Sequence, residues 1–157
     1  MTVIPLRGAL DAADLRVAVV RSRFNPVVTE GLLAGALAVI EQSGAAAPTV
    51  VEVEGAFELA VVARELTNRH DAVVCVGAVI LGETDHYEHI AHRASEGLQR
   101  VMLDTGVPVA FGVLTVRDVE HALARSGPGE ANKGAEAATA AIRTASLLRT
   151  LRDEGAG

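Results

Sequence analysis

The sequence is poor in cysteine and in aromatic residues. Its 157 residues include one cysteine, no tryptophan, one tyrosine and three phenylalanines. A single cysteine excludes a disulfide within the chain, which fits a reducing compartment such as the cytoplasm. Cys75 lies in the apolar run Ala72–Ile80, where a cysteine usually packs as a small buried hydrophobe. We therefore expect a cytoplasmic protein with an ordinary aliphatic core.

The chain also lacks a hydrophobic run long enough to cross a membrane. The longest such run, Ala72–Gly82, is well short of the roughly 18 residues that a membrane helix needs. Arg7 and Asp11 interrupt the N-terminus, so we expect no secretory leader. The net charge of −6 leaves no basic stripe to neutralise a phosphate backbone. We therefore expect neither a membrane nor a nucleic-acid partner.

Short apolar runs rich in β-branched residues alternate with longer segments of helical character. Runs that are apolar nearly throughout are typical of parallel strands covered on both faces. We expect strands at about residues 15–21, 49–53, 72–80 and 109–114, and helices at about residues 27–43, 57–68, 85–105, 117–126 and 133–152. Strand–helix alternation builds right-handed βαβ units. The sequence therefore predicts an α/β fold, a three-layer α/β/α sandwich with a four-stranded, mostly parallel sheet.

The length fits one domain, which we expect to span residues 1–157. Residues 1–14 form an N-terminal arm in this interpretation. Within it, Thr2–Leu6 either adds an edge strand to the sheet or reaches a neighbouring subunit. The tail, at about residues 154–157, is expected to fray.

Ligands of open parallel sheets bind at the carboxyl ends of the strands. Phe24 and Phe57 lie just past two of the expected strands, and Phe111 lies in the last one. Aromatic side chains gathered at one sheet edge can stack on a planar heterocycle. The alternative is that these rings fill the core, and the sequence leaves both interpretations open.

Gly82-Glu83-Thr84 follows the longest strand and opens a helix. Backbone N–H groups and the positive helix end attract anions at such a turn, although an ordinary tight turn has the same sequence features. His86 follows in the first turn, where an imidazole can exchange protons near neutral pH. His86 and His89 share a helix face. Because no other cysteine or histidine cluster completes a zinc site, we expect no metal.

Lys133 is the only lysine in the chain, against thirteen arginines. A compact ammonium can form a Schiff base or a point-charge hydrogen bond to a ligand, which a guanidinium does less well. A third explanation is that the single lysine stands at this position by chance. Arg125 lies eight positions earlier, across a Gly-Pro-Gly turn, and has the fork of donors that binds phosphate.

Taken together and in order, these segments resemble the lumazine synthase family. The similarity runs from about Leu15 to Leu151, and each motif is weak alone but specific in this order. The matching motifs are Arg23-Phe24-Asn25, Gly55-Ala56-Phe57-Glu58-Leu59, Gly77-Ala78-Val79-Ile80, Gly82-Glu83-Thr84-Asp85-His86-Tyr87, the segment from Pro108 to Thr115, Arg125, and Asn132-Lys133-Gly134. The resemblance implies a riboflavin-biosynthesis enzyme that needs no cofactor. It would condense 5-amino-6-(D-ribitylamino)uracil with 3,4-dihydroxy-2-butanone 4-phosphate to 6,7-dimethyl-8-ribityllumazine, phosphate and water.

The resemblance also implies a role for each matching residue. His86 would move protons. The pyrimidine and ribityl chain would be held by Phe24, Asn25, Ala56, Phe57, Glu58, Val79, Ile80, Phe111 and Lys133, and the phosphate by Gly82, Glu83, Thr84 and Arg125. In the family the substrate amine itself attacks the ketone, which favours the hydrogen-bonding role of Lys133 over a Schiff base.

Sites of this family lie between subunits. The resemblance therefore implies a homo-oligomer, either a pentamer or a 60-subunit shell of pentamers. Phe111, Arg125 and Lys133 would then come from the neighbouring copy. The product is what riboflavin synthase consumes, so a functional link to that enzyme is expected.

Three positions depart from the family pattern, namely Ala60, Leu81 and Glu130. Leu81 replaces a common basic residue, and Glu130 places an acid near the expected phosphate site. These departures support one alternative, a non-catalytic flavin- or lumazine-binding shell paralogue. A second alternative is the related archaeal-type riboflavin synthase, which would consume lumazine and not make it.

Overall fold

A four-stranded sheet forms the centre of the computed structural model, which describes residues 1–156. The strands are β1 (Val17–Ser22), β2 (Thr49–Val53), β3 (Ala72–Ile80) and β4 (Val109–Val116). They lie in the order β2-β1-β3-β4, and each neighbouring pair is parallel. All four carboxyl ends therefore point to the same edge of the sheet, as the sequence predicted.

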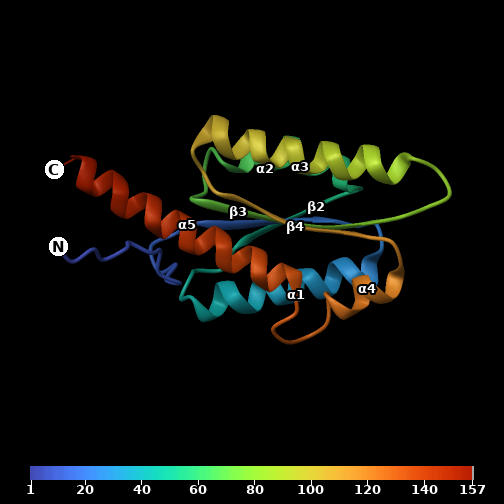
Figure 1. Cartoon of the computed structure of the whole chain (residues 1–157), viewed down its shortest axis with the longest axis horizontal. Coiled ribbons are helices and arrows are strands. Elements are labelled where there is room, and N and C mark those ends of the chain that lie inside the picture. Colours follow the sequence, from blue (N-terminus) through green and yellow to red (C-terminus); the bar gives the residue numbers. More distant parts are fainter. Residues whose placement is uncertain (157) are drawn as a thin grey trace.

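Helices cover both faces of the sheet (Figure 1). α2 (Leu59–Leu66) and α3 (His86–Thr105) lie on one face, and α1 (Pro26–Gln42), α4 (Val119–Ala124) and α5 (Lys133–Ala156) lie on the other. A single 3-10 turn, η1 (Ala56–Glu58), leads into α2. The three-layer α/β/α sandwich is confirmed. Within residues 1–156, the helices are too short or too polar to cross a bilayer.

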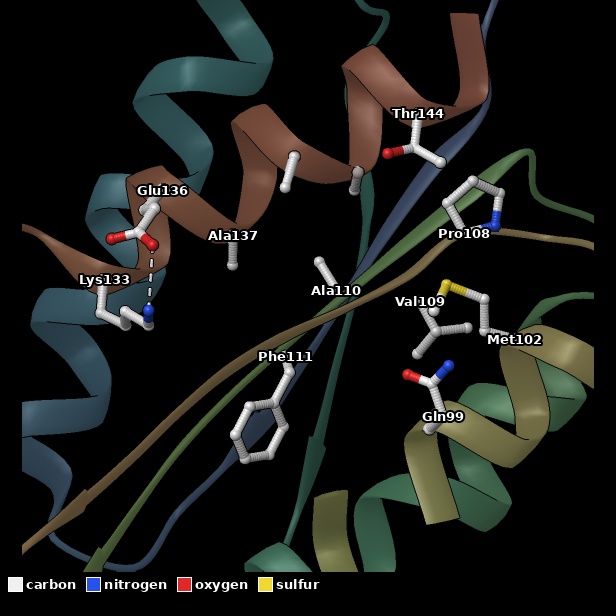
Figure 2. Close-up of a pocket in the computed structure, with 12 residues that line it drawn as sticks. Gln99, Met102, Pro108, Val109, Ala110, Phe111, Lys133, Glu136, Ala137 and Thr144 are labelled. Carbon is white, nitrogen blue, oxygen red and sulfur yellow. Dashed lines mark hydrogen bonds and ion pairs between the residues drawn. The ribbon is translucent and has the colours of Figure 1, made fainter. Parts of the chain in front are cut away.

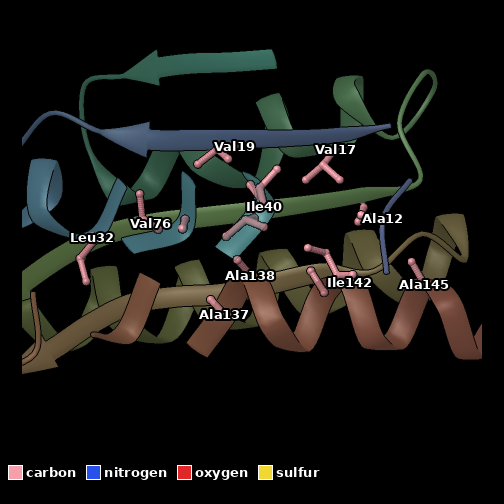
Figure 3. Close-up of a cluster of buried hydrophobic side chains, with 14 of the residues drawn as sticks. Ala12, Val17, Val19, Leu32, Ile40, Val76, Ala137, Ala138, Ile142 and Ala145 are labelled. Atoms are coloured by element: carbon pink, nitrogen blue, oxygen red, sulfur yellow. The ribbon is translucent and has the colours of Figure 1, made fainter. Parts of the chain in front are cut away.

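Alternate side chains of the central strands enter two separate hydrophobic cores. Val19 of β1 packs with Ile40 of α1 and Ile142 of α5 on one face of the sheet (Figure 3). Val20, the next residue, packs on the other face with Leu98 of α3. Because both faces of these strands are buried, their sequences are apolar nearly throughout.

Cys75 lies in β3 and is fully buried. Burial in apolar surroundings disfavours the thiolate and raises the pKa of the Cys75 thiol to about 12. The expectation that this residue packs as a small hydrophobe is confirmed.

Several elements end at other residues than the sequence predicted. α4 covers only Val119–Ala124, and α5 continues to Ala156, through part of the expected frayed tail. Gly157 lies outside the described residues. Residues 1–9 form no strand in this chain's sheet, so the first alternative for Thr2–Leu6, an edge strand, is not found, and the second, an arm to a neighbouring subunit, stays a prediction. Arg143 of α5 instead donates to the carbonyl oxygen of Gly8 at 3.0 Å and holds this segment against the helix.

Candidate active site

The carboxyl ends of β1, β2 and β3 surround a pocket of about 620 Å³. The loops that follow these strands and the first turns of α3 form its walls. Its lining residues are Phe24, Glu54, Gly55, Ala56, Phe57, Glu58, Ala78, Val79, Ile80, Gly82, Thr84, His86, Tyr87 and Ile90. Most residues that the sequence predicted for the ring, the proton transfer and the turn are thus brought together.

Phe24 and Phe57 expose their rings at this pocket. The exposed fractions are 63% and 60%, which excludes the interpretation that these two rings fill the core. Leaving a phenyl side chain in water forgoes roughly 1.5–3 kcal/mol of burial free energy. Exposed rings beside a pocket are typical of a surface that a ligand or a partner covers.

The turn from β1 into α1 is built around Asn25. Its φ of 58° lies in the left-handed region, which asparagine tolerates better than most residues. Pro26 follows at the start of the helix, where its missing N–H costs nothing. Asn25 is not among the lining residues of the pocket, although it is next to Phe24. Its side-chain Nδ2 is buried and has no hydrogen-bond partner within residues 1–156.

The loop after β2 orients Glu58. The N–H of Gly55 donates to Oε1 of Glu58 at 3.1 Å. Arg23 forms ion pairs with Glu52 at 3.5 Å and with Glu54 at 3.7 Å. Exposed pairs of this kind add little stability, but they restrict where the acidic side chains lie. Because Gly55 holds Oε1 of Glu58 and Glu58 lines the pocket, its carboxylate is placed to accept hydrogen bonds from hydroxyl or N–H groups of a ligand.

The turn from β3 into α3 brings His86 to the pocket wall. Oγ1 of Thr84 accepts the backbone N–H of His86 at 3.3 Å. Asp85 pairs instead with His89, with 3.1 Å between Oδ2 and Nε2. The imidazole of His86 is exposed in the first helical turn. Glu83, predicted with Thr84 for phosphate, does not line this pocket.

Phe111, Arg125 and Lys133 lie elsewhere, along the outer edge of β4. They line an open depression of about 580 Å³. Nη1 of Arg125 donates to the carbonyl oxygen of His121 at 3.0 Å, and Nζ of Lys133 lies 3.0 Å from Oε1 of Glu136. Figure 2 shows the adjoining hollow of about 270 Å³, with Phe111 of β4 and the Lys133–Glu136 pair of α5 among its walls. The predicted site residues thus fall into two groups on one chain.

Sequence reasoning missed some residues that line the first pocket, and part of the signal was present. Ile90 lies four positions after His86, on the same helix face. Ala78 lies two positions before Ile80, on the same strand face. Within residues 1–156, no group of three or more histidine, cysteine, aspartate or glutamate side chains is placed to hold a metal ion.

Comparison with known proteins identifies the family. Residues 14–149 match the family model described as 6,7-dimethyl-8-ribityllumazine synthase. The chain belongs to the lumazine synthase family. Relatives with this name include proteins of Mycobacterium ulcerans (48% identity, 96% of each chain covered), Mycolicibacterium gilvum (47%, 94% of each) and Mycobacterium avium (47%, 95% of this chain and 94% of the relative). The family resemblance seen in the sequence motifs is confirmed over nearly the full length.

Proposed function

We propose that this member of the lumazine synthase family condenses 5-amino-6-(D-ribitylamino)uracil with 3,4-dihydroxy-2-butanone 4-phosphate to give 6,7-dimethyl-8-ribityllumazine. The observation that carries the proposal is the pocket of about 620 Å³, which combines exposed phenyl rings, a carboxylate and an imidazole at one sheet edge. Family membership and the relatives named for this product support the same reaction.

The pyrimidine substrate fits the first pocket. Its planar ring stacks on Phe24 and Phe57. Backbone groups of Val79 and Ile80, at the carboxyl end of β3, offer hydrogen bonds to the edge of the ring. Glu58 accepts hydrogen bonds from the ribityl hydroxyl groups. Each of these residues lines the pocket.

The chemistry requires proton transfers and no cofactor. The 5-amino group attacks the ketone carbon of the second substrate, and loss of one water gives an imine. Phosphate then leaves, and the ribityl-bearing nitrogen closes the ring with loss of a second water. His86, exposed at the pocket wall, accepts and returns protons in these steps. Holding both reactants together lowers the activation barrier by up to roughly 7–11 kcal/mol.

The phosphate is bound between two copies of the chain in this proposal. Arg125 and Lys133 line the β4 edge, whereas Gly82 and Thr84 line the first pocket. A neighbouring copy that places its β4 edge beside the pocket supplies Phe111 to the ring and the arginine fork to the phosphate. The enzyme therefore acts as a homo-oligomer, built from pentamers.

The test mixes the purified protein with both substrates and follows lumazine by absorbance and fluorescence against the uncatalysed background. We expect acceleration, and Arg125→Ala should raise KM for the butanone phosphate. Arg100→Ala, an exposed arginine of α3, is the matched control and should leave KM unchanged. No acceleration by the folded, assembled protein contradicts the proposal. Ring binding without turnover would then point to a lumazine-binding paralogue, and consumption of lumazine to a riboflavin synthase.

A further inference from the structure

Each group of site residues is called a half-site here, and the β4 half-site carries Arg125 and Lys133. We propose that Asn132 is a positioning residue for this β4 half-site. This inference rests on the proposed function, which assigns the substrate phosphate to Arg125. Asn132 ends the loop that joins α4 to α5, and only 2% of its surface is exposed. It therefore acts through the loop and not through contact with a substrate.

The side-chain amide of Asn132 joins the end of the loop to its beginning and also to α1. Nδ2 of Asn132 donates to the carbonyl oxygens of Gly31 at 3.0 Å, Ser126 at 3.2 Å and Gly127 at 3.0 Å. Gly31 belongs to α1, and the other two residues begin the loop. The two N–H groups of this amide thus lie within hydrogen-bond distance of three carbonyl oxygens, one in α1 and two in the loop, which ties the loop to the helix.

The rest of Asn132 fixes the start of α5. Oδ1 accepts the N–H of Ala135 at 3.0 Å and caps the first turn of the helix. The N–H of Lys133 donates to the carbonyl oxygen of Arg125 at 2.8 Å. This backbone hydrogen bond joins the two ends of the loop at Arg125 and Lys133, and it sets the distance between the backbones of these two residues.

Helix α1 has two glycines that admit this arrangement. A Cβ atom at Gly35 would lie 2.1 Å from Oδ1 of Asn132, and one at Gly31 would lie 2.1 Å from the carbonyl oxygen of Ser126. Glycine is unfavourable inside a helix. Two glycines one turn apart therefore mark a close approach between α1 and the loop that a larger residue would prevent.

Asparagine is suited to this position because it combines an acceptor oxygen with two N–H donors on a short side chain. Serine keeps an acceptor for the helix cap but cannot bridge three carbonyl oxygens. Replacing Asn132 by serine thus leaves the charges of Arg125 and Lys133 intact and loosens only the backbone that carries them. Phosphate binding through Arg125 should weaken most, and ring binding much less, because the ring stacks mainly on Phe24 and Phe57 of the other pocket.

Steady-state kinetics of Asn132→Ser in the assembled protein test this role. We expect KM for the butanone phosphate to rise about tenfold, the size of one weakened charge-assisted hydrogen bond. The inhibition constant of inorganic phosphate should rise by the same factor, while KM for the ribitylaminouracil stays within about twofold. Gly35→Ala displaces the Asn132 side chain from the α1 side and should change the two KM values in the same way. This second variant keeps the test available if Asn132→Ser assembles poorly. The double variant should add no further effect.

Ile142→Val, in the buried face of α5 ten residues beyond Asn132, is the control for general loss of stability. It should lower Tm and leave both KM values unchanged. A lower Tm with unchanged KM values in Asn132→Ser and Gly35→Ala would overturn the positioning role. If the wild-type protein forms no lumazine, the proposed function fails separately. Calorimetric titration with inorganic phosphate then decides the role of Asn132, since equal affinity of wild type and variant overturns it and weaker affinity of the variant supports it.

Discussion

Phe24 can be changed without disturbing the core, because its ring is exposed at the rim of the pocket. We expect Phe24→Ala to remove about 0.5–1.5 kcal/mol of ring stacking, which raises KM for the ribitylaminouracil about 2- to 13-fold. KM for the butanone phosphate should not change. Leu103→Ala, another exposed apolar residue at the far end of α3, is the control. An unchanged KM for the uracil substrate in Phe24→Ala would remove Phe24 from the ring site.

His86 is assigned the proton transfers because it is the histidine that lines the pocket. We expect His86→Ala to lower kcat by roughly 10²–10⁴, the usual contribution of a general acid–base group. His89→Ala is the matched control in the same helix, since His89 pairs with Asp85 and does not line the pocket. Equal rates for the two variants would show that the substrate amine reacts without His86.

Cys75 gives a prediction about pH. Its pKa rises from the ordinary value of 9.0 to about 12 in the folded protein, because burial disfavours the thiolate. A raised pKa means that the thiol's contribution to stability is complete below about pH 9 and is lost as the pH rises toward about 12. We expect the native protein to resist a thiol reagent at pH 8 and to react fully after unfolding in guanidinium. Rapid labelling of the native protein would contradict the buried placement.

At the scale of elements, the strands were the most predictable part. The bounds of β2 and β3 agree with the sequence expectation. The run of β3 is buried nearly throughout, as expected of a central strand covered on both faces. β2 is an edge strand with mostly exposed residues, and its β-branched composition was the signal that predicted it. α4 was predicted too long. Asp118 has extended backbone and accepts the N–H of His121 at 3.2 Å, so it caps the helix and residue 117 stays outside.

Helices α1 and α5 pack closely because glycine leaves room at their contact. A substitution at Gly134 tests this explanation directly. A Cβ atom at Gly134 would lie 1.9 Å from the carbonyl oxygen of Leu32. We expect Gly134→Ala to lower the free energy of unfolding by about 1–3 kcal/mol through overpacking. Gly155→Ala is the matched control in the last turn of α5, where an added Cβ meets nothing within 4 Å. It should be neutral or slightly stabilising in thermal unfolding, and an equal loss in both variants would contradict the account.

The N-terminal segment could not be predicted from its own pattern. Val3, Ile4 and Leu6 are exposed, and residues 1–9 form no strand in this chain's sheet. Exposed apolar side chains of this kind gain free energy only when another surface covers them. The conformation of this segment therefore depends on contacts that local sequence does not encode.

At the scale of the whole molecule, the sequence motifs named most of the candidate site but not its division. Phe24 and His86 reach one pocket because β1 and β3 are neighbours in the sheet. Arg125 and Lys133 lie at the other border because β4 is an edge strand. The order β2-β1-β3-β4 decides this separation, and it is a property of the fold that no single motif contains.

The division into two groups leads to the most direct test of the account, a subunit-mixing experiment. His86→Ala and Arg125→Ala are each impaired in this account, but each retains the half-site that the other lacks. After both are dissociated, mixed in equal amounts and reassembled, roughly a quarter of the interfaces in a ring should pair an intact His86 with an intact Arg125. We predict that, at a butanone phosphate concentration well below KM, where both parent variants are slow, lumazine formation by the mixture recovers to roughly a quarter of the wild-type rate. A mixture no more active than the average of its two components would contradict a lumazine synthase site shared between neighbouring copies.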